Sequence, residues 1–395
     1  MSEYLKVQEV PGLYGKLKID EKRIQKIWAD QNHLNKELST ECGNKLKIIS
    51  SGIWNLCEEG PDFKDASILL NDKKITGDVE IHFRTEDWNR HYHHKDPNYN
   101  RVVLHVVLFP SKSNCEFCLN EKSKKIPTLI LLKCLNKSIE EILELEVLKS
   151  LAGYKSVLPP NFDSIEALNQ IKELNVQLAR DRWKQKQIFA EKRLTHCSVE
   201  DAFHKYFLEV LGYRRNRIQM NELAEVFPVN WWKKNDSFPN LAYNSISDWK
   251  TRGVRPANHP KLRLEQYSKI WKFNPNWINS LIEFEIQNLP LNKNSNRKNL
   301  NIGKINQLWT KELGDVIGRS RLNTLWIDAC LPLLSIIHKK DYFATWFFWY
   351  YGDFPITLKN IASEAGIPDI SINHPLSNGH LQGILEYCIK KNILG

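Results

Sequence analysis

Hydrophobic and polar positions follow two different patterns along the chain, and the pattern changes near residue 137. Before that point, apolar positions at helical spacing over 24–38 predict one helix. Short runs rich in β-branched and aromatic residues predict strands at 46–50, 67–70, 78–83, 102–109 and 128–134. Asn71 and Asp72 lie between the second and third runs and predict a hairpin turn. The run at 102–109 is apolar except for His105, which predicts a buried central strand.

Helical periodicity dominates the rest of the chain. Helices are expected to begin at Ser138 and Ser164, because each serine is followed by acidic residues that suit a first helical turn. The helix from Ser164 should run to about residue 193, and further helices are expected near 199–211, 220–227, 262–272, 275–288, 301–317, 321–339, 341–351, 357–365 and 379–391. The polar stretch 292–301 is a candidate linker. The sequence therefore predicts an α+β chain, with a small mixed sheet and a flanking helix in a domain at 1–137 and a large α-helical domain at 138–395.

Polar residues with metal-binding chemistry are concentrated between residues 52 and 109. This segment contains five of the twelve histidines of the chain together with several acidic residues. Glu80 and His82 alternate with apolar residues in the expected strand 78–83, so they share one face with Asp78. A charged side chain inside an apolar strand requires a partner, and oxygen and nitrogen ligands at this density suit a divalent metal ion. The alternative is a hydrogen-bonded polar loop with surface histidines and no metal.

The same segment resembles an uncharacterised bacterial family, domain of unknown function 2851. The resemblance rests on Gly60–Phe63, Gly77–His82, Asp87–Trp88, His91, His93, Asp96–Pro97, Tyr99 and Val103–Val107. Arg255, Pro256, Asn258, Pro260 and Arg263 are similar to a second signature of that family, and Asn373, His374 and 382–391 are similar to its C-terminal region. The resemblance thus covers nearly the whole chain. It implies a bacterial source and a protein of unknown activity.

A second resemblance concerns mechanism. The pair Pro61–Asp62, followed after seventeen residues by Glu80, Ile81 and His82, is similar to the motif of restriction-endonuclease-like nucleases. The resemblance implies that Asp62 and Glu80 hold Mg²⁺ or Mn²⁺, with the carbonyl group of Ile81 as a further ligand. The residue that handles the attacking water in these nucleases is a lysine, and here it is His82. A neutral imidazole can act as a general base near pH 7, so the sequence remains compatible with metal-dependent cleavage of a phosphodiester.

Other residues of the segment have supporting roles in this interpretation. His91, His93, Asp96 and His105 are expected to be accessory groups of the site. His91 and His93 also form the H-x-H pair of cupin proteins, but the polar stretch around them predicts a loop or short helix in place of a strand. Cys115 and Cys118 have the spacing of a zinc knuckle without a second pair, so they are expected to be ordinary loop cysteines.

Charge and composition extend the picture to partners. Lysine and arginine exceed aspartate and glutamate by 56 to 46, which gives a formal charge of +10 and permits DNA or RNA as a partner. Arg252, Arg255 and Arg263 surround a proline-rich turn and are the arginines expected to bind nucleic acid. The alternative to a nuclease is a non-catalytic nucleic-acid-binding or scaffold protein. The sequence gives no indication of the oligomeric state.

The sequence also predicts a cellular location. The N-terminal residues lack a basic segment followed by an apolar stretch, so no secretory signal is expected. No apolar run approaches the roughly 20 residues that a membrane-spanning helix needs. The eight cysteines are scattered over a long chain, as in proteins with reduced thiols. A cytoplasmic protein that does not enter a membrane is therefore expected.

Overall fold

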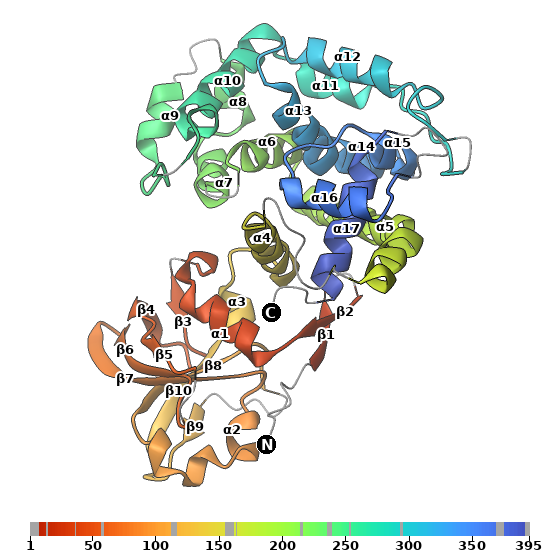
Figure 1. Cartoon of the computed structure of the whole chain (residues 1–395). Helices are drawn as coiled ribbons and strands as arrows, with labels where there is room; N and C mark the ends of the chain where they lie inside the picture. The colour runs from red at the N-terminus through yellow and green to blue at the C-terminus, as the bar shows by residue number, and fades with distance from the viewer. Residues whose placement is uncertain are drawn as a thin grey trace. The chain divides into compact units, whose positions relative to one another are not determined.

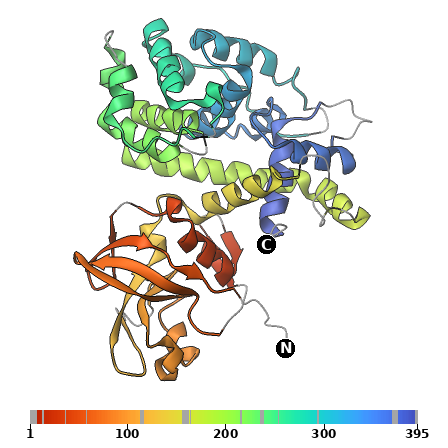
Figure 2. The ribbon, with the colours of Figure 1, turned by 60° about the vertical axis from the view of Figure 1, so that its left-hand side comes forward.

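The computed structural model describes residues 8–12, 15–35, 37–56, 59–111, 117–154, 162, 164–213, 216–234, 239–252, 254–292, 295–368 and 375–391. The chain divides into two compact units, Met1–Leu143 and Glu144–Gly395, which are described separately (Figures 1 and 2). The first unit contains the β-sheet and the second is helical, so the chain is α+β as the sequence predicts.

An eight-stranded mixed sheet forms the centre of the first unit. Its strand order is β3-β4-β6-β7-β8-β10-β9, and β5 pairs with β6. The pairs β4–β6, β6–β7 and β9–β10 are antiparallel, whereas β7–β8 and β8–β10 are parallel. The strands are β3 (Leu38–Ser39), β4 (Lys45–Ser50), β5 (Ile53–Trp54), β6 (Phe63–Leu70), β7 (Lys73–His82), β8 (Val102–Val107), β9 (Phe117–Leu119) and β10 (Lys125–Ile130). A separate hairpin, β1 (Gln8–Gly12) and β2 (Gly15–Ile19), was not expected from the sequence.

The predicted hairpin turn and central strand are both confirmed. Asn71 and Asp72 connect β6 to β7 with φ angles of 48° and 64°, the left-handed backbone that two-residue hairpins require. Every residue of β8 is buried, and the strand lies between β7 and β10. Residues Gly77–His82 of β7 therefore lie in the middle of the sheet, between β6 and β8.

The helix at the start of this unit is shorter than the apolar pattern suggests. Helix α1 (Glu21–Ala29) begins at the N-cap Asp20, whose side chain accepts a hydrogen bond from the backbone of Arg23. After Ala29 the chain leaves the helix, although Leu34 and Leu38 continue the apolar spacing and are buried. Leu38 is buried as part of the edge strand β3, where the sequence predicted helical turns.

A similar change of structure occurs at the last predicted strand, 128–134. Strand β10 ends at Ile130, and the short helix α3 (Leu131–Cys134) follows directly. The apolar run is continuous across both elements, and periodicity alone does not separate a buried strand from a buried helical turn.

Helices make up the second unit. They are α5 (Ile165–His196), α6 (Val199–Leu211), α7 (Arg217–Val226), α8 (Val229–Lys233), α9 (Pro239–Ser245), α10 (Pro260–Phe273), α11 (Trp277–Ile282), α12 (Ile302–Glu312), α13 (Arg319–Leu325), α14 (Leu331–Ile337), α15 (Phe343–Phe348), α16 (Ile356–Glu364) and α17 (Asn378–Lys390). Helix α4 (Ile139–Leu151) spans the division between the units. Ser164 caps α5 as predicted, by accepting a hydrogen bond from the backbone of Ala167. Helices α8 and α9 are too short to give a clear periodic signal and were not predicted.

The segment 321–339 was expected to be one helix and is interrupted. A π-helical turn, Trp326–Cys330, separates α13 from α14. Pro332 lies in the first turn of α14 and has no backbone N–H to donate to the preceding turn. The wider π-turn accommodates this missing hydrogen bond within an otherwise continuous helix.

The candidate linker at 292–301 contains residues that pack into the helical unit. Residues 295–301 are described by the structure and 293–294 lie outside the described residues. Leu300 is fully buried in the main helical core. The side chain of Arg297 donates hydrogen bonds to the carbonyl oxygens of Phe348 and Leu376, which ties this segment to two later ones.

A buried arginine joins three elements of the helical unit. Arg182 on α5 is only 5% exposed and lies 2.7 Å from a carboxylate oxygen of Glu144 and 4.0 Å from one of Glu386. Its Nε donates to the side chain of Gln382 on α17. Arg182 therefore lies close to two carboxylates, and Lys390 is a second positive partner of Glu386 at 3.6 Å.

The charge of Glu144 makes the stability of the helical unit depend on pH. Burial is the largest single influence and raises the pKa of Glu144, but the charges of Arg182, Lys186 and Arg217 and the hydrogen bond from Arg182 together outweigh it and lower this pKa from 4.5 to about 2. Stability gained from ionised Glu144 is therefore present above pH 4.5 and lost as the pH falls toward 2. Glu386 opposes this trend, because burial raises its pKa. Between pH 5 and 3 we expect the wild type to lose up to about 2 kcal/mol more unfolding free energy than Glu144→Gln. Urea unfolding at several pH values measures this difference, and equal losses in the two proteins would contradict it.

None of the helices in the described part of the chain is both long and apolar enough to span a membrane. Helix α5 has the length, at 32 residues, but it carries many charged side chains.

Candidate metal centre

The polar residues of β7 face a polar residue of the neighbouring parallel strand. Glu80 of β7 pairs in register with His105 of β8, and His82 lies two residues further along β7 on the same face. All three side chains are buried, with exposed fractions of 5%, 0% and 2% for Glu80, His105 and His82. The opposite face of β7 carries Val79 and Ile81 into the apolar core. The strand alternation predicted from the sequence thus separates a polar cluster from the core of the first unit.

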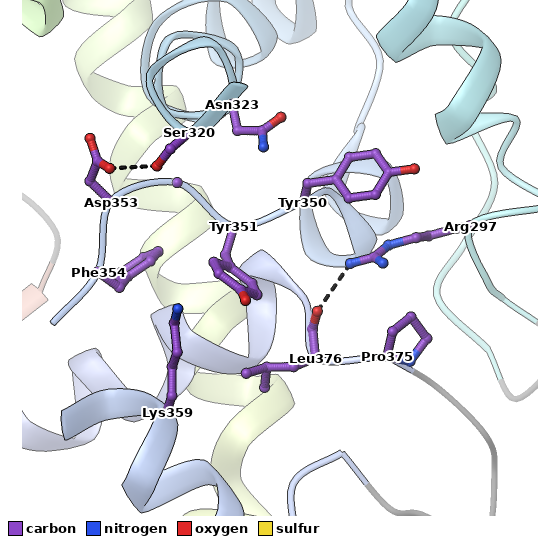
Figure 3. A pocket seen from close by; sticks show the side chains of 11 residues that line it. Arg297, Ser320, Asn323, Tyr350, Tyr351, Asp353, Phe354, Lys359, Pro375 and Leu376 are labelled. Carbon is purple, nitrogen blue, oxygen red and sulfur yellow. Dashed lines mark hydrogen bonds between the residues drawn. The ribbon is translucent and has the colours of Figure 1, made fainter. Parts of the chain in front are cut away.

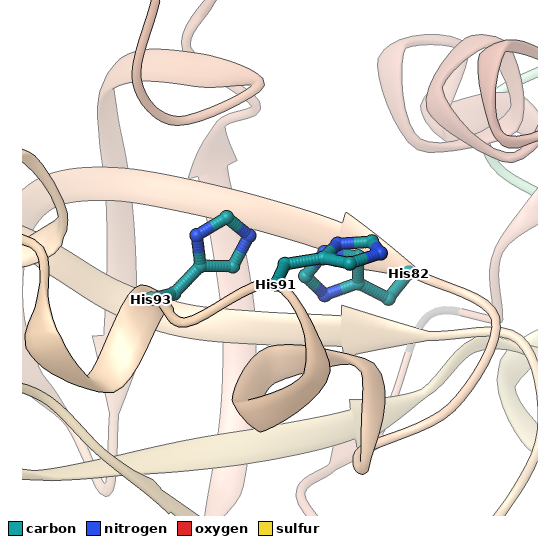
Figure 4. Close-up of side chains that lie close together, drawn as sticks. All are labelled: His82, His91 and His93. Carbon is teal, nitrogen blue, oxygen red and sulfur yellow. The ribbon is translucent and has the colours of Figure 1, made fainter. Parts of the chain in front are cut away.

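Two further histidines reach this cluster from the segment that follows β7. The segment forms three short helical turns, α2 (Asp87–Arg90), η2 (His93–Lys95) and η3 (Pro97–Tyr99). Tyr92 adopts a left-handed conformation with φ of 61°, which separates α2 from η2. His91 and His93 on either side of Tyr92 both lie close to His82 (Figure 4). This pair lies in a helical loop, as the sequence predicts, and not on a strand as in cupins.

His82, His91 and His93 form a group that could hold a metal ion. One ring nitrogen from each lies within 4.8 Å of the others. The closest pair is His82 Nε2 and His91 Nδ1, at 3.0 Å. Oxygen Oε1 of Glu80 lies 3.4 Å from His82 Nε2 and 3.3 Å from His93 Nε2. Nitrogens bound to one ion at about 2.0–2.1 Å are separated by about 3–3.5 Å, so only small side-chain movements are needed to bind.

His93 directs a buried ring nitrogen toward this group. Its Nε2 is buried and has no hydrogen-bond partner among the described residues, although Glu80 Oε1 is close. Burial lowers the pKa of His93 to about 4, so the imidazole is neutral at pH 7 and offers a lone pair. Its ring is stacked on Tyr99 with a centroid distance of 3.8 Å, which fixes its orientation. A buried neutral nitrogen with a free lone pair has the chemistry of a metal ligand.

His105 is the hydrogen-bond partner of Nδ1 of His82. Nε2 of His105 lies 2.9 Å from Nδ1 of His82, and Nδ1 of His105 lies 3.2 Å from the sulfur of Cys118. Burial is the main cause that lowers the pKa of His105 to about 3, so this ring also stays neutral. A neutral His105 that donates a hydrogen bond from Nδ1 to Cys118 has a lone pair on Nε2, which accepts a hydrogen bond from Nδ1 of His82. The lone pair of His82 is then on Nε2, which faces His91 and Glu80. Cys118 was expected to be an ordinary loop cysteine, and Cys115 lies outside the described residues.

Asp62 lies beside Glu80 but outside the histidine group. Its backbone N–H donates to Glu80 Oε2 at 3.0 Å, and its own carboxylate accepts hydrogen bonds from the backbone of Ile81 and from the side chain of Gln25. Gln25 is held in turn by the indole of Trp54. Burial and the nearby charge of Glu80 raise the pKa of Asp62 well above its ordinary value, and burial does the same for Glu80. The two carboxylates form a coupled pair with an increased tendency to hold a proton.

Asp96 and the three predicted nucleic-acid-binding arginines lie outside the histidine group. Asp96 caps η3 by accepting a hydrogen bond from the backbone of Asn98. In the helical unit, Arg252 and Arg255 are exposed, whereas Arg263 is 5% exposed and donates to the side chains of Asn258 and Gln266. Burial lowers the pKa of Arg263 to about 10.

Loss of the hydrogen bond between His105 and His82 should weaken metal binding. Loss of a group that orients a metal ligand typically costs about 10- to 100-fold in affinity, and we expect this for His105→Phe. Thr128→Val is the matched control, because Thr128 is buried beside His105 in β10 and its hydroxyl has no hydrogen-bond partner among the described residues. Competition with a chromophoric chelator measures both affinities. Equal affinities would show that His105 has no part in holding the ion.

Comparisons with known proteins place the chain in a family. The family model described as "Protein of unknown function (DUF2851)" matches residues 21–242, which is more than half of the chain and includes every residue of the histidine group. Searches of the curated proteins and of the solved structures give no significant match. The comparisons do not support the resemblance to restriction-endonuclease-like nucleases, and the resemblance beyond residue 242 stays a prediction. The chain belongs to the DUF2851 family of proteins of unknown function.

Proposed function

We propose that this chain is a metal-dependent phosphodiesterase that acts on DNA or RNA, with the ion held by His82, His91 and His93. The observation that carries the proposal is the convergence of three imidazoles on the carboxylate of Glu80 in a largely buried site. Three protein ligands leave a position open for water, and a bound ion lowers the pKa of that water. Among the three histidines, His91 is half-buried, whereas His82 and His93 are buried.

The chemistry of the ligands bears on the identity of the ion. Mg²⁺ and Mn²⁺, the ions implied by the nuclease resemblance, prefer oxygen ligands. Imidazole nitrogens favour ions such as Zn²⁺ and Fe²⁺. The three histidines therefore favour Zn²⁺ over Mn²⁺ and Mn²⁺ over Mg²⁺. In this proposal His82 is a metal ligand and no longer the residue that handles the attacking water.

In this proposal Glu80 accepts the proton of the attacking water and Asp62 positions Glu80. Glu80 Oε1 lies within 3.4 Å of nitrogens of His82 and His93, so it would be available to accept a proton from water activated by an ion held there. A carboxylate with a raised pKa is a better proton acceptor near pH 7, because its basicity is matched to the operating pH. The backbone N–H of Asp62 holds Glu80 Oε2, which leaves Oε1 facing the histidines. Asp62 is thus a positioning residue, and Glu80 is the general base.

A second candidate function is a nucleic-acid-binding protein in which the ion is structural. It is favoured by the burial of His82, His93 and Glu80, which limits access to the ion. Closed sites of this kind stabilise a fold without turnover.

Turnover by metal-loaded protein separates the two functions. The full chain would be loaded with Zn²⁺, Mn²⁺ or Mg²⁺ and incubated with single- and double-stranded DNA and RNA. His91→Ala, purified in parallel, controls for contaminating nucleases. Cleavage that needs Zn²⁺ or Mn²⁺ and is absent in His91→Ala is the expected result. Metal binding without cleavage would support the structural ion, and equal cleavage by both proteins would refute the proposal.

Nucleic-acid binding should depend on the exposed arginines of the helical unit. Phosphate contacts release counterions, so affinity should fall steeply with added salt. Replacing Arg252 and Arg255 by glutamine should lower the slope of log K against log [salt] by up to about 2, and Lys269→Gln provides an exposed control. Fluorescence anisotropy with labelled oligonucleotides measures the slope. If the slope does not change, the nucleic acid binds elsewhere.

A further inference from the structure

A cavity of about 590 Å³ in the helical unit has a lining that the proposed metal chemistry does not use (Figure 3). Five parts of this unit line it: the turn 350–354 between α15 and α16, helix α13, residues 375–376 before α17, and the single residues Arg297 and Lys359. Cavities of about 300–1,000 Å³ are the usual size of small-molecule sites. Its side chains combine aromatic rings with positive charge, which points to a ligand that is both aromatic and anionic.

Arg297 provides a fixed positive charge at this cavity. Its Nε and Nη2 donate to the carbonyl oxygens of Phe348 and Leu376, at 2.9 and 3.0 Å. The guanidinium lies 4.4 Å from the ring centroid of Tyr350. It has no carboxylate partner in the described part of the chain, and burial lowers its pKa. The backbone carbonyls thus orient this charge without neutralising it, so the guanidinium is suited to bind an anion.

A second positive charge lies across the cavity. Lys359 of α16 places its ammonium 4.5 Å from the ring centroid of Tyr351, and no carboxylate of the described residues pairs with it. The acidic residue of the lining, Asp353, is already compensated, because it pairs with the buried Arg321 at 2.9 Å and accepts a hydrogen bond from Ser320. The cavity therefore has a net positive charge.

Aromatic rings also line the cavity. Tyr350, Tyr351 and Phe354 all line the cavity, and Figure 3 shows Tyr351 between Arg297 and Lys359. Gly352 holds this turn close to α13, since a Cβ atom there would lie 2.2 Å from the hydroxyl of Thr324. Nucleobases stack on aromatic side chains, and Arg and Lys bind phosphate.

We propose that this cavity binds a nucleoside phosphate, with the base against the tyrosine rings and the phosphate attracted by Arg297 and Lys359. The inference is independent of the metal centre, because it uses residues of the helical unit alone. The site would give the protein a nucleotide ligand in addition to any polymeric substrate.

Calorimetric titration of the full chain in EDTA tests the proposal, with adenosine 5′-monophosphate, adenosine and inorganic phosphate as probes. The monophosphate is expected to bind at least about tenfold more tightly than either part alone. Phosphate binding with equal affinity would refute the aromatic part of the site, and adenosine binding with equal affinity would refute the role of the two cations. The absence of binding by all three at millimolar concentration would overturn the proposal.

Variants locate the binding in this cavity. Lys359→Gln and Arg297→Gln should each weaken monophosphate binding about tenfold, whereas Lys269→Gln, at an exposed position of α10, should not. Because Arg297 also holds two backbone carbonyls, Lys359→Gln decides the matter if Arg297→Gln fails to fold. His91→Ala should bind the nucleotide like the wild type, so failure of the metal proposal and failure of this one give different results. Unchanged affinity in Lys359→Gln would place the nucleotide elsewhere.

Discussion

Replacing Glu80 by glutamine should lower the rate of metal-dependent phosphodiester cleavage by about 10²- to 10⁴-fold and leave the ion bound. The amide keeps the size of the side chain and its contact with the backbone of Asp62, but it cannot accept a proton from water. The three histidines remain to hold the ion. Turnover and metal content would be measured on the same preparation, and Glu37→Gln provides an exposed control in the same unit.

His91→Ala should give the complementary result. Loss of one of three imidazoles is expected to weaken metal binding by at least about 100-fold, since even an outer supporting group is worth up to that much. Activity then falls because the ion is lost, and a large excess of metal should restore part of it. If Glu80→Gln loses the ion and His91→Ala keeps it, the carboxylates Asp62 and Glu80 hold the metal as in restriction-endonuclease-like nucleases.

The largest expected effect on stability is at Arg182. Replacing it by methionine leaves the buried Glu386 with only the half-exposed Lys390, at 3.6 Å, as a positive partner, and removes the ion-pair partner of Glu144. Breaking a buried ion pair in this way costs about 3–5 kcal/mol. Lys184→Met on the same helix is the control, because Lys184 is exposed.

Tryptophan fluorescence during urea unfolding measures the effect of Arg182→Met. Ten of the thirteen tryptophans follow residue 143, so the signal reports mainly on the helical unit. A loss below about 1 kcal/mol, similar to that of an exposed ion pair, would show that water already compensates these carboxylates.

Much of the fold follows from local sequence patterns. The mixed sheet, the turn at Asn71 and Asp72, the buried strand β8 and the start of α5 at Ser164 were all predicted. Each depends on a short pattern that the surrounding structure does not override. The interrupted helix around Pro332 and the early end of α1 were not predicted, because tertiary packing decides whether an apolar run continues as helix.

The candidate site was predictable only in part. Glu80 and His82 were identified because polar residues interrupt an apolar strand. The grouping of His82 with His91 and His93 depends on the left-handed backbone of Tyr92, and no sequence pattern around a tyrosine predicts that conformation. The role of His105 depends on the parallel register between β7 and β8, which hydrophobicity alone does not determine. The sequence therefore suggested Asp62 and Glu80 as metal ligands with His91, His93 and His105 as accessory groups, whereas the structure groups His82, His91 and His93 beside Glu80.

X-ray absorption spectroscopy of the zinc-loaded full chain tests the central claim most directly. The account predicts one tightly bound Zn²⁺ per chain, with three imidazole nitrogens at about 2.0–2.1 Å. In His91→Ala and His93→Ala the imidazole scattering should decrease and the stoichiometric binding should disappear. A wild-type chain that binds no Zn²⁺, or that holds it through oxygen ligands alone, would contradict the assignment of His82, His91 and His93 as a metal centre.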